Sequence, residues 1–269
     1  MVSVTENKLF KSIKARFSGA AWSIFAIFCF LAVWHLAVVL TPIGKLMPSP
    51  VKVAESLVNS FVNPIGPHTI QIHALYSLKR IMVGYSVACI TGILFGIAIG
   101  LSKTLNSIFY PIFELIRPIP TVAWIPIAII WFGTNEMSKY FIVFYGAFAN
   151  VVVSVYSGIL NVDPVLVGAA KMLGCTDRQV IFKIVLPAAV PSIFNGMQVA
   201  LSASTMSVVV AEMIKAYEGI GWIIHAGQQT ADMTTVLTGM VALALFGLVL
   251  SSILSAIERK LCAWSIRNT

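Results

Sequence analysis

Hydrophobic and polar positions alternate along this chain on the scale of whole membrane crossings. Runs of about 20 residues without a charged side chain are separated by short segments that carry the lysines, arginines and acids. A helix needs roughly 20 apolar residues to cross about 30 Å of hydrocarbon. We therefore expect transmembrane helices at about 20–40, 81–101, 140–160, 190–211 and 234–257.

A sixth apolar run, residues 107–133, is interrupted by four prolines and also carries Glu114 and Arg117. Proline removes a backbone donor and clashes with the preceding helical turn, so the pattern predicts a bent or discontinuous helix. Such a helix persists in a membrane only where protein or a water-filled cavity satisfies the freed groups. Two interpretations follow, namely a broken helix beside a permeation path or a kinked helix buried in a bundle.

Composition supports the same fold class. Hydrophobic residues make up 58% of the 269 positions and charged residues only 10%, whereas soluble domains carry about 25% charged residues. The first run has no small-residue cleavage site and is longer than the core of a signal peptide, so we expect it to be retained. The sequence predicts an all-α integral membrane protein, a bundle of about six transmembrane helices over residues 20–260.

The net charge of +8 reflects scattered basic residues rather than a nucleic-acid patch. Six crossings put both ends on one side, and the bias of basic residues places segments 1–19 and 261–269 in the cytoplasm. The inner segments would hold Lys8, Lys11, Lys14, Arg16, Lys103, Lys171, Arg178, Lys183, Arg259, Lys260 and Arg267. The outer segments would hold Lys45, Lys52, Lys79, Arg80, Lys139 and Lys215, with Lys79 and Arg80 flanking the second crossing.

The inner segment at residues 161–187 contains capping and termination signals for two short helices. Asp163 suits an N-cap, Pro164 the first helical position and Gly174 a left-handed stop. Thr176 and Gln179 then have the spacing of a capping box, and we expect the second helix to end at Leu186 before Pro187. The first helix is too short to span a bilayer, and its apolar side chains must be buried in its own bundle or in a groove on a cytoplasmic partner.

This segment resembles the cytoplasmic loop of ATP-binding-cassette importer permeases, with the pattern E-A-A, three residues, Gly, nine residues, I-x-L-P. The matching residues are Ala169, Ala170, Gly174, Ile184, Leu186 and Pro187, and Gly168 stands where the pattern has glutamate. The resemblance implies a type I permease fold in which this loop docks on an ATPase and transmits its closure. The residues it assigns to coupling are Gly168, Ala169, Ala170, Gly174, Arg178, Ile184, Leu186 and Pro187.

Three further stretches, IRPIPTVAWIPIAIIWFG, AEMIKAYEGIGWII and ERKLCAW, are similar to the nitrate, sulfonate and taurine branch of these permeases. That resemblance implies a small anionic solute, a bacterial inner membrane location, an external solute-binding protein and two cytoplasmic ATPase subunits. It also implies a second permease copy, most simply in a homodimer. The runner-up solute is a thiamine-pyrimidine or riboflavin-like heterocycle.

The chain carries no energy-converting site of its own. There is no G-x-x-x-x-G-K-[ST] phosphate loop and no nucleophile–base set, so we expect no catalytic residue and no bound cofactor, with ATP and Mg²⁺ held by the partner ATPase. The four cysteines and four histidines lack disulfide or metal spacing, so no metal site is expected. An ion-driven secondary transporter is the alternative class, but no clear inverted repeat is visible.

One helical stripe in the fifth run is polar. Asn195, Gln198, Ser202, Thr205 and Glu212 fall on a face about 100° wide, and polar groups facing lipid are costly. The stripe either lines a translocation path or makes interhelical hydrogen bonds. Glu212 of this stripe and Arg117 of the third run also have simpler alternatives.

Glu212, near the outer end, is awkward for an anion path and could pair with Lys215 or contact the binding protein. Arg117 is the one cation within a predicted crossing. It could attract an anionic solute, or it could neutralise Glu114 one turn away.

Overall fold

The structure, a computed structural model, describes residues 22–214 and 216–261. Among these residues the regular elements are all helical. Five helices are long and apolar enough to cross a membrane, and a bent pair makes a sixth crossing if it is counted as one span. This architecture confirms the all-α bundle, while the predicted terminal segment 1–19 and nearly all of segment 261–269 lie outside the described residues.

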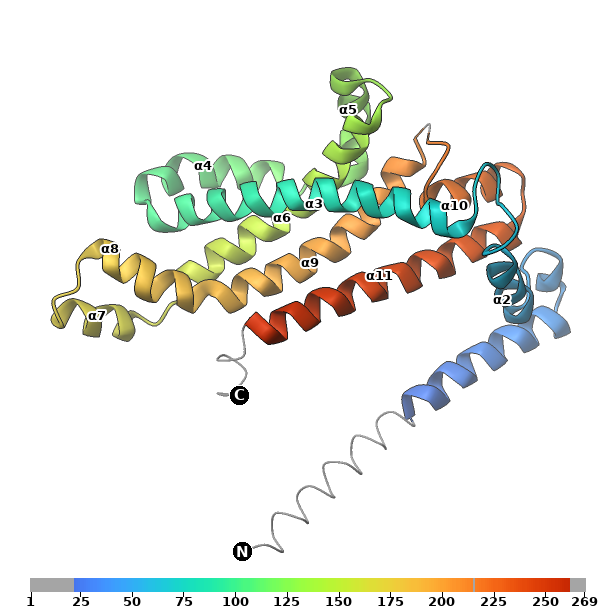
Figure 1. Cartoon of the computed structure of the whole chain (residues 1–269), viewed down its shortest axis with the longest axis horizontal. Coiled ribbons are helices and arrows are strands. Elements are labelled where there is room, and N and C mark those ends of the chain that lie inside the picture. Colours follow the sequence, from blue (N-terminus) through green and yellow to red (C-terminus); the bar gives the residue numbers. More distant parts are fainter. Residues whose placement is uncertain (1–21, 215, 262–269) are drawn as a thin grey trace, which may run out of the picture.

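The chain begins with a helix over Trp22–Leu40 and then follows the order drawn in Figure 1. The further elements are η1 (Pro42–Lys45), α2 (Pro50–Asn59), α3 (Ile70–Leu101), α4 (Lys103–Ile116), η2 (Thr121–Trp124), α5 (Ile125–Phe132), α6 (Glu136–Leu160), α7 (Pro164–Met172), α8 (Asp177–Val180), η3 (Ile181–Val185), α9 (Leu186–Glu212), α10 (Ile220–Gln229) and α11 (Met233–Leu261).

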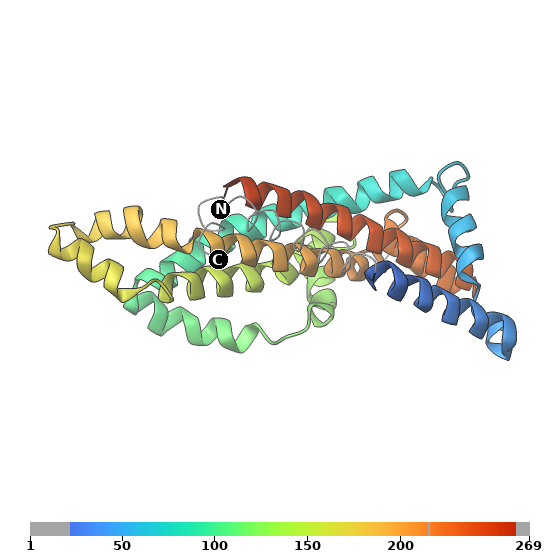
Figure 2. The same cartoon turned by 90° about the horizontal axis from the view of Figure 1, so that it is seen from below.

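Helices α3, α6 and α9 form the packed centre and run side by side along the long axis (Figures 1 and 2). Glycines make the close approach of α3 to α6 possible. A Cβ atom on Gly84 would lie 2.7 Å from Val143 Cβ, and one on Gly96 would lie 2.8 Å from Val155 Cβ. The four-residue glycine repeat of α3 is therefore a packing surface, as small residues at membrane helix interfaces usually are.

The third crossing is broken, as its prolines predict. Helices α4 and α5 are bent by 95° at a short break, and α5 stands away from the long axis in Figure 1. The Tyr145 hydroxyl of α6 donates to the carbonyls of Ile116 and Ile119, at 2.8 and 3.3 Å, so α6 supplies a hydrogen-bond donor to the backbone at the break.

Two predicted boundaries are wrong. Helix α3 begins at Ile70 rather than near residue 81, so Lys79 and Arg80 lie inside the helix instead of flanking it. The second short helix does not end before Pro187, because helix continues without interruption over Asp177–Glu212. A π-helical turn, η3, precedes the proline and shifts the hydrogen-bond register, which makes room for a ring that lacks an N–H.

The two ends of the molecule differ in composition. Helices α7 and α8 form one end, and α2 and α10 lie at the other (Figure 1). The start of α4 and the end of α11 point toward the α7–α8 end, so most of the described basic residues predicted to be inner gather there. The side of the membrane on which this end lies remains a prediction.

Candidate functional site

The corner between α7 and α8 has the caps that the sequence predicts. Asp163 accepts a hydrogen bond from the Val165 N–H at 2.8 Å, and Pro164 occupies the first turn. Helix α7 ends before Gly174, whose φ of 83° is in the left-handed region that favours glycine. The corner is therefore set by backbone chemistry, without help from a tertiary contact at Gly174.

The second half of the corner is closed by a reciprocal cap. The Gln179 N–H donates to the Thr176 hydroxyl at 3.4 Å, and the Thr176 N–H donates to the Gln179 side chain at 2.8 Å. This arrangement is the predicted capping box. Helix α8 then continues through η3 into α9, so a displacement of the corner is transmitted directly to a helix of the packed centre.

The corner, residues 161–187, is anchored on one side and open on the other. Ala170, Val180 and Val185 belong to the main hydrophobic core. Met172 and Leu173 are each 85% exposed. Exposed apolar side chains of this size beyond the ends of the crossings indicate a protein interface. The other exposed apolar side chains of this surface are Val165, Leu166 and Phe182.

The remaining predicted coupling residues surround that surface. Gly168 is exposed, and a Cβ added there would meet no atom within 4 Å, so the glutamate of the family pattern would fit. Arg178 and Pro187 are exposed, while Ala169, Ile184 and Leu186 are half-buried. Lys171 pairs with Asp177 at 3.0 Å across the corner.

The polar stripe of α9 divides into two groups. Asn195 and Ser202 are exposed and remain candidates for the path. Gln198 instead donates to Ser255 at 2.9 Å and Glu258 at 2.5 Å, both on α11. Thr205 donates to the Leu201 carbonyl of its own helix. Gln198 therefore makes interhelical hydrogen bonds to α11, which was the second of its two predicted roles.

Glu212 does not belong to an open stripe, and its assignment to the path is corrected. Its side chain is fully buried, and its carboxylate accepts hydrogen bonds from Arg80 at 2.9 Å, Ser77 at 2.8 Å and the Gly221 N–H at 2.8 Å. Its partner is Arg80 of α3; the alternative partner, Lys215, lies outside the described residues. Burial of a carboxylate is tolerated here because a guanidinium, a hydroxyl and a backbone N–H all donate to it.

Arg80 joins three helices and a loop at the end opposite the corner. Besides Glu212 of α9, its guanidinium forms a two-bond pair with Glu136 of α6, both bonds 2.8 Å long. It also donates to the Glu218 carbonyl at 2.6 Å. Only 1% of the Arg80 side chain is exposed. We call Arg80, Glu212 and Ser77, together with the partly exposed Glu136 at their edge, the buried ion cluster.

One face of α3 also holds the loop that follows α9. His73 Nδ1 accepts from the Gly219 N–H at 3.0 Å, and the Ser77 hydroxyl accepts from the Ile220 N–H at 2.9 Å. Gly219 has a φ of 117°, and a Cβ there would collide with the Glu212 carboxylate. The loop is thus folded tightly onto the buried ion cluster.

Sequence reasoning missed this cluster because it started the second crossing after Arg80. A signal was present: His73, Ser77 and Arg80 are spaced four and three apart, which places three polar side chains on one helix face. Ionisable residues within membrane helices usually pair with an opposite charge elsewhere in the bundle. Here Arg80 and Glu212 form that pair.

Arg117 pairs with Glu114 at 3.1 Å, as the alternative of local neutralisation expects. Both side chains are about half exposed, so the pair leaves the guanidinium accessible. Among the described residues no group of three His, Cys, Asp or Glu could hold a metal ion. Cys29, Cys89 and Cys175 are free thiols, and Cys262 lies outside the described part.

The sequence is similar to a known family of membrane transport proteins. The family described as binding-protein-dependent transport system inner membrane component matches residues 92–262. The taurine transport system permease protein TauC of Escherichia coli (strain K12) is 35% identical over 237 residues, covering 87% of this chain and 86% of TauC. The nitrate import permease protein NrtB of Synechocystis sp. is 32% identical over 240 residues, covering 87% and 86%.

A solved structure shares the fold. A chain from the inward-facing MetNI methionine ABC transporter superposes with a TM-score of 0.53 and 19% identity, covering 69% of this chain and 96% of its own length. At that identity the likeness concerns the fold alone. It agrees with the expected type I importer permease architecture.

Proposed function

Because the chain belongs to the family of binding-protein-dependent transport system inner membrane components, we propose that it carries a small anionic solute, such as taurine, another sulfonate or nitrate, across the membrane. The chain is the membrane-spanning permease subunit of an ATP-binding-cassette importer. The observation that carries the solute class is similarity, over 87% of the chain, to permeases named for taurine and for nitrate.

A separate ATPase drives the cycle from the corner between α7 and α8, which faces the cytoplasm, and it holds the ATP and Mg²⁺. The exposure of Met172 and Leu173 supports this contact, because such side chains need a partner groove. The unbroken helix over Asp177–Glu212 supports the transmission, since α9 packs in the centre of the bundle. Closure of the ATPase moves the corner, and the corner moves α9.

A second copy of the chain and an external solute-binding protein complete the importer in the bacterial inner membrane. Asn195 and Ser202 lie exposed on α9, although polar groups facing lipid are costly. This exposure supports a path that forms where two permease copies face each other. The binding protein then delivers the solute from the end opposite the corner.

Uptake in proteoliposomes that contain the permease, its ATPase and the binding protein tests this function. Radiolabelled taurine and nitrate are expected to accumulate only when ATP is supplied on the corner side. Accumulation driven by a proton gradient without ATP would instead identify a secondary transporter. Transport of a thiamine-pyrimidine or riboflavin-like heterocycle, with neither anion transported, would refute the anion assignment.

Thiol labelling tests the path. In a background without native cysteines, Ser202→Cys is expected to react much faster with a membrane-impermeant maleimide than Ser204→Cys. Ser204 is the matched control because it lies two positions away on α9 and is fully buried. Equal labelling of the two variants in every transport state would remove Ser202 from the path.

A further inference from the structure

His73 joins two loops at the end of the molecule opposite the corner. Its side chain is fully buried in the first turn of α3, and both ring nitrogens face backbone groups. Nδ1 accepts from the Gly219 N–H of the loop after α9, and Nε2 lies 3.0 Å from the Ile65 carbonyl of the loop before α3. One imidazole therefore connects the two loops to each other and to a helix of the packed centre. We call His73 with its two backbone partners the histidine bridge.

The two bonds of the histidine bridge fix the charge of the ring. A nitrogen that accepts from an N–H carries no proton, whereas a nitrogen beside a carbonyl must donate one. Nε2 therefore carries the proton, Nδ1 has none, and His73 is neutral in this structure. A second proton would enter at Nδ1 and point at the Gly219 N–H. Two donors would then face each other, and the buried Gly219 N–H would lose its acceptor.

Close packing prevents the ring from relieving that conflict by itself. The ring stacks on Trp222 of α10, with centroids 5.3 Å apart and an angle of 13° between the planes. Gly66 of the loop before α3 approaches the same indole so closely that a Cβ would collide with it. Rotation of the imidazole by 180° would put carbon atoms where the nitrogens are, so both bonds would be lost. A doubly protonated His73 therefore requires that a loop moves.

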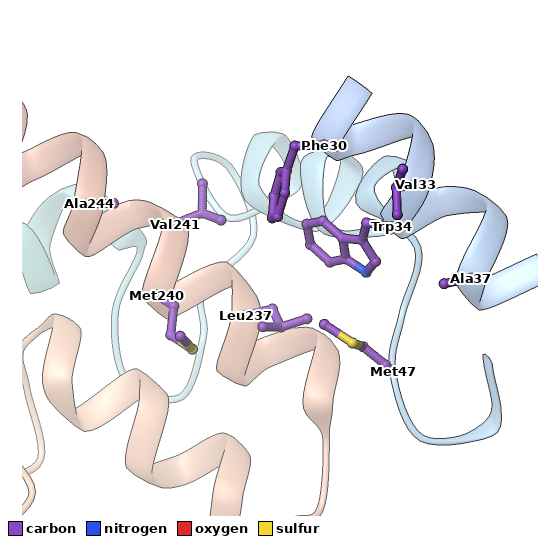
Figure 3. A pocket seen from close by; sticks show the side chains of 9 residues that line it. All are labelled: Phe30, Val33, Trp34, Ala37, Met47, Leu237, Met240, Val241 and Ala244. Carbon is purple, nitrogen blue, oxygen red and sulfur yellow. The ribbon is translucent and has the colours of Figure 1, made fainter. Parts of the chain in front are cut away.

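The other ionisable groups of this region do not share the conflict. Among the described residues they are His68, Tyr76, Arg80, Glu212 and Glu218. His68 Nε2 lies 3.9 Å from the Glu218 carboxylate, and both side chains are about one third exposed, so a proton on His68 adds an ion pair and breaks no backbone bond. The apolar groove between the first helix and α11, whose side chains Figure 3 shows, has no titratable residue in its lining.

We propose that the histidine bridge is a pH-sensitive link that holds the loop after α9 to α3 only while His73 is neutral. Histidine ordinarily changes charge between about pH 5 and 8, and acid favours the released form because that form alone takes a second proton without losing a buried backbone bond. The loop follows directly on α9, so its release frees the end of α9 opposite the corner. If this end faces outward, as the proposed function has it, the importer slows when the outside becomes acidic.

Hydrogen exchange of the assembled transporter in detergent tests the histidine bridge. The protection factor of the Gly219 amide, corrected for the intrinsic exchange rate, is compared at about pH 7.5 and about pH 5. In the wild type it is expected to fall about 2- to 10-fold on acidification, the range for loss of one hydrogen bond. In His73→Asn it is expected to be the same at both pH values, because the amide oxygen accepts from Gly219 and does not titrate. His68→Asn is the matched control and is expected to keep the wild-type change.

Uptake measures the consequence for transport. In proteoliposomes with ATP and constant pH inside, lowering the external pH over the same range is expected to slow uptake in the wild type and in His68→Asn more than in His73→Asn. Nitrate and sulfonates remain anionic over this range, so the charge of the solute does not change. Any effect of pH on the binding protein is common to all variants and cancels in the comparison.

The proposal is upheld if the pH dependence of Gly219 protection and of uptake is lost in His73→Asn and kept in His68→Asn. It is overturned if Gly219 protection in the wild type does not change with pH, a result that depends on no variant. It is also overturned if His73→Asn, or His73→Gln where the first does not assemble, changes with pH as much as the wild type. Absence of uptake for every anion at both pH values would refute the proposed function and leave the exchange result standing.

Discussion

Replacement of Arg80 by glutamine is expected to lower the free energy of unfolding by about 3–5 kcal/mol, the cost of removing one partner of a buried ion pair. The substitution removes the cation that faces the fully buried Glu212 carboxylate and also breaks the pair with Glu136. Glu212 would then be a buried charge without its cation. Thermal unfolding in detergent measures the loss of stability in Arg80→Gln, and we expect the melting temperature to fall on the order of 10 °C.

Arg117→Gln is the matched control. It removes a guanidinium of the same kind from a pair that is about half exposed, and such pairs contribute about 0–1 kcal/mol. Comparable melting temperatures for the two variants would contradict the structural role of the buried ion cluster. The double variant Arg80→Gln with Glu212→Gln is expected to be more stable than the sum of the single changes, because no uncompensated carboxylate remains at that position.

Replacement of Gly174 by valine is expected to uncouple ATP hydrolysis from uptake. The glycine has a φ of 83°, which a β-branched residue adopts only at a cost of about 1–3 kcal/mol, so the corner would shift to relieve that strain. Uptake in proteoliposomes is expected to fall about tenfold or more, since strain of this size corresponds to that factor in an equilibrium. The solute-loaded binding protein would no longer stimulate the ATPase. No neighbouring atom lies within 4 Å of the added Cβ, so the protein should still fold.

Gly168→Ala provides the comparison within the same corner. It lies in helical backbone with open space around it and gains about 1 kcal/mol of helix propensity. Coupled ATPase activity and uptake are expected to remain at wild-type levels. Retained coupling in Gly174→Val would show that the corner geometry does not matter for transmission, and would count against the docking role.

Local signals in the sequence predicted local structure well. Asp163, Gly174 and the Thr176–Gln179 capping box all form as their residue types require, because each is satisfied within a few positions of the chain. The break in the third crossing follows equally from its prolines. The continuation of the helix through Pro187 could not be predicted in this way, since it depends on a π-helical turn upstream.

The candidate site was predictable only in part. The corner was found from its own residues, and its exposure agrees with an interface. The polar stripe of α9 was correct as a pattern, but the roles of its members depend on neighbours far away in sequence. Gln198 meets Ser255 and Glu258 of α11, and Glu212 meets Arg80 of α3.

The sequence by itself determined that this chain crosses a membrane several times and carries a short two-helix corner. Hydrophobic length and backbone capping act over one helix or one turn, so they can be read from neighbouring residues. Only the tertiary structure decided which charges are buried and which acids Arg80 pairs with. These features arise from contacts between residues far apart in the chain, 56 positions for Arg80 and Glu136 and 132 for Arg80 and Glu212, and no local pattern encodes which helix faces will meet.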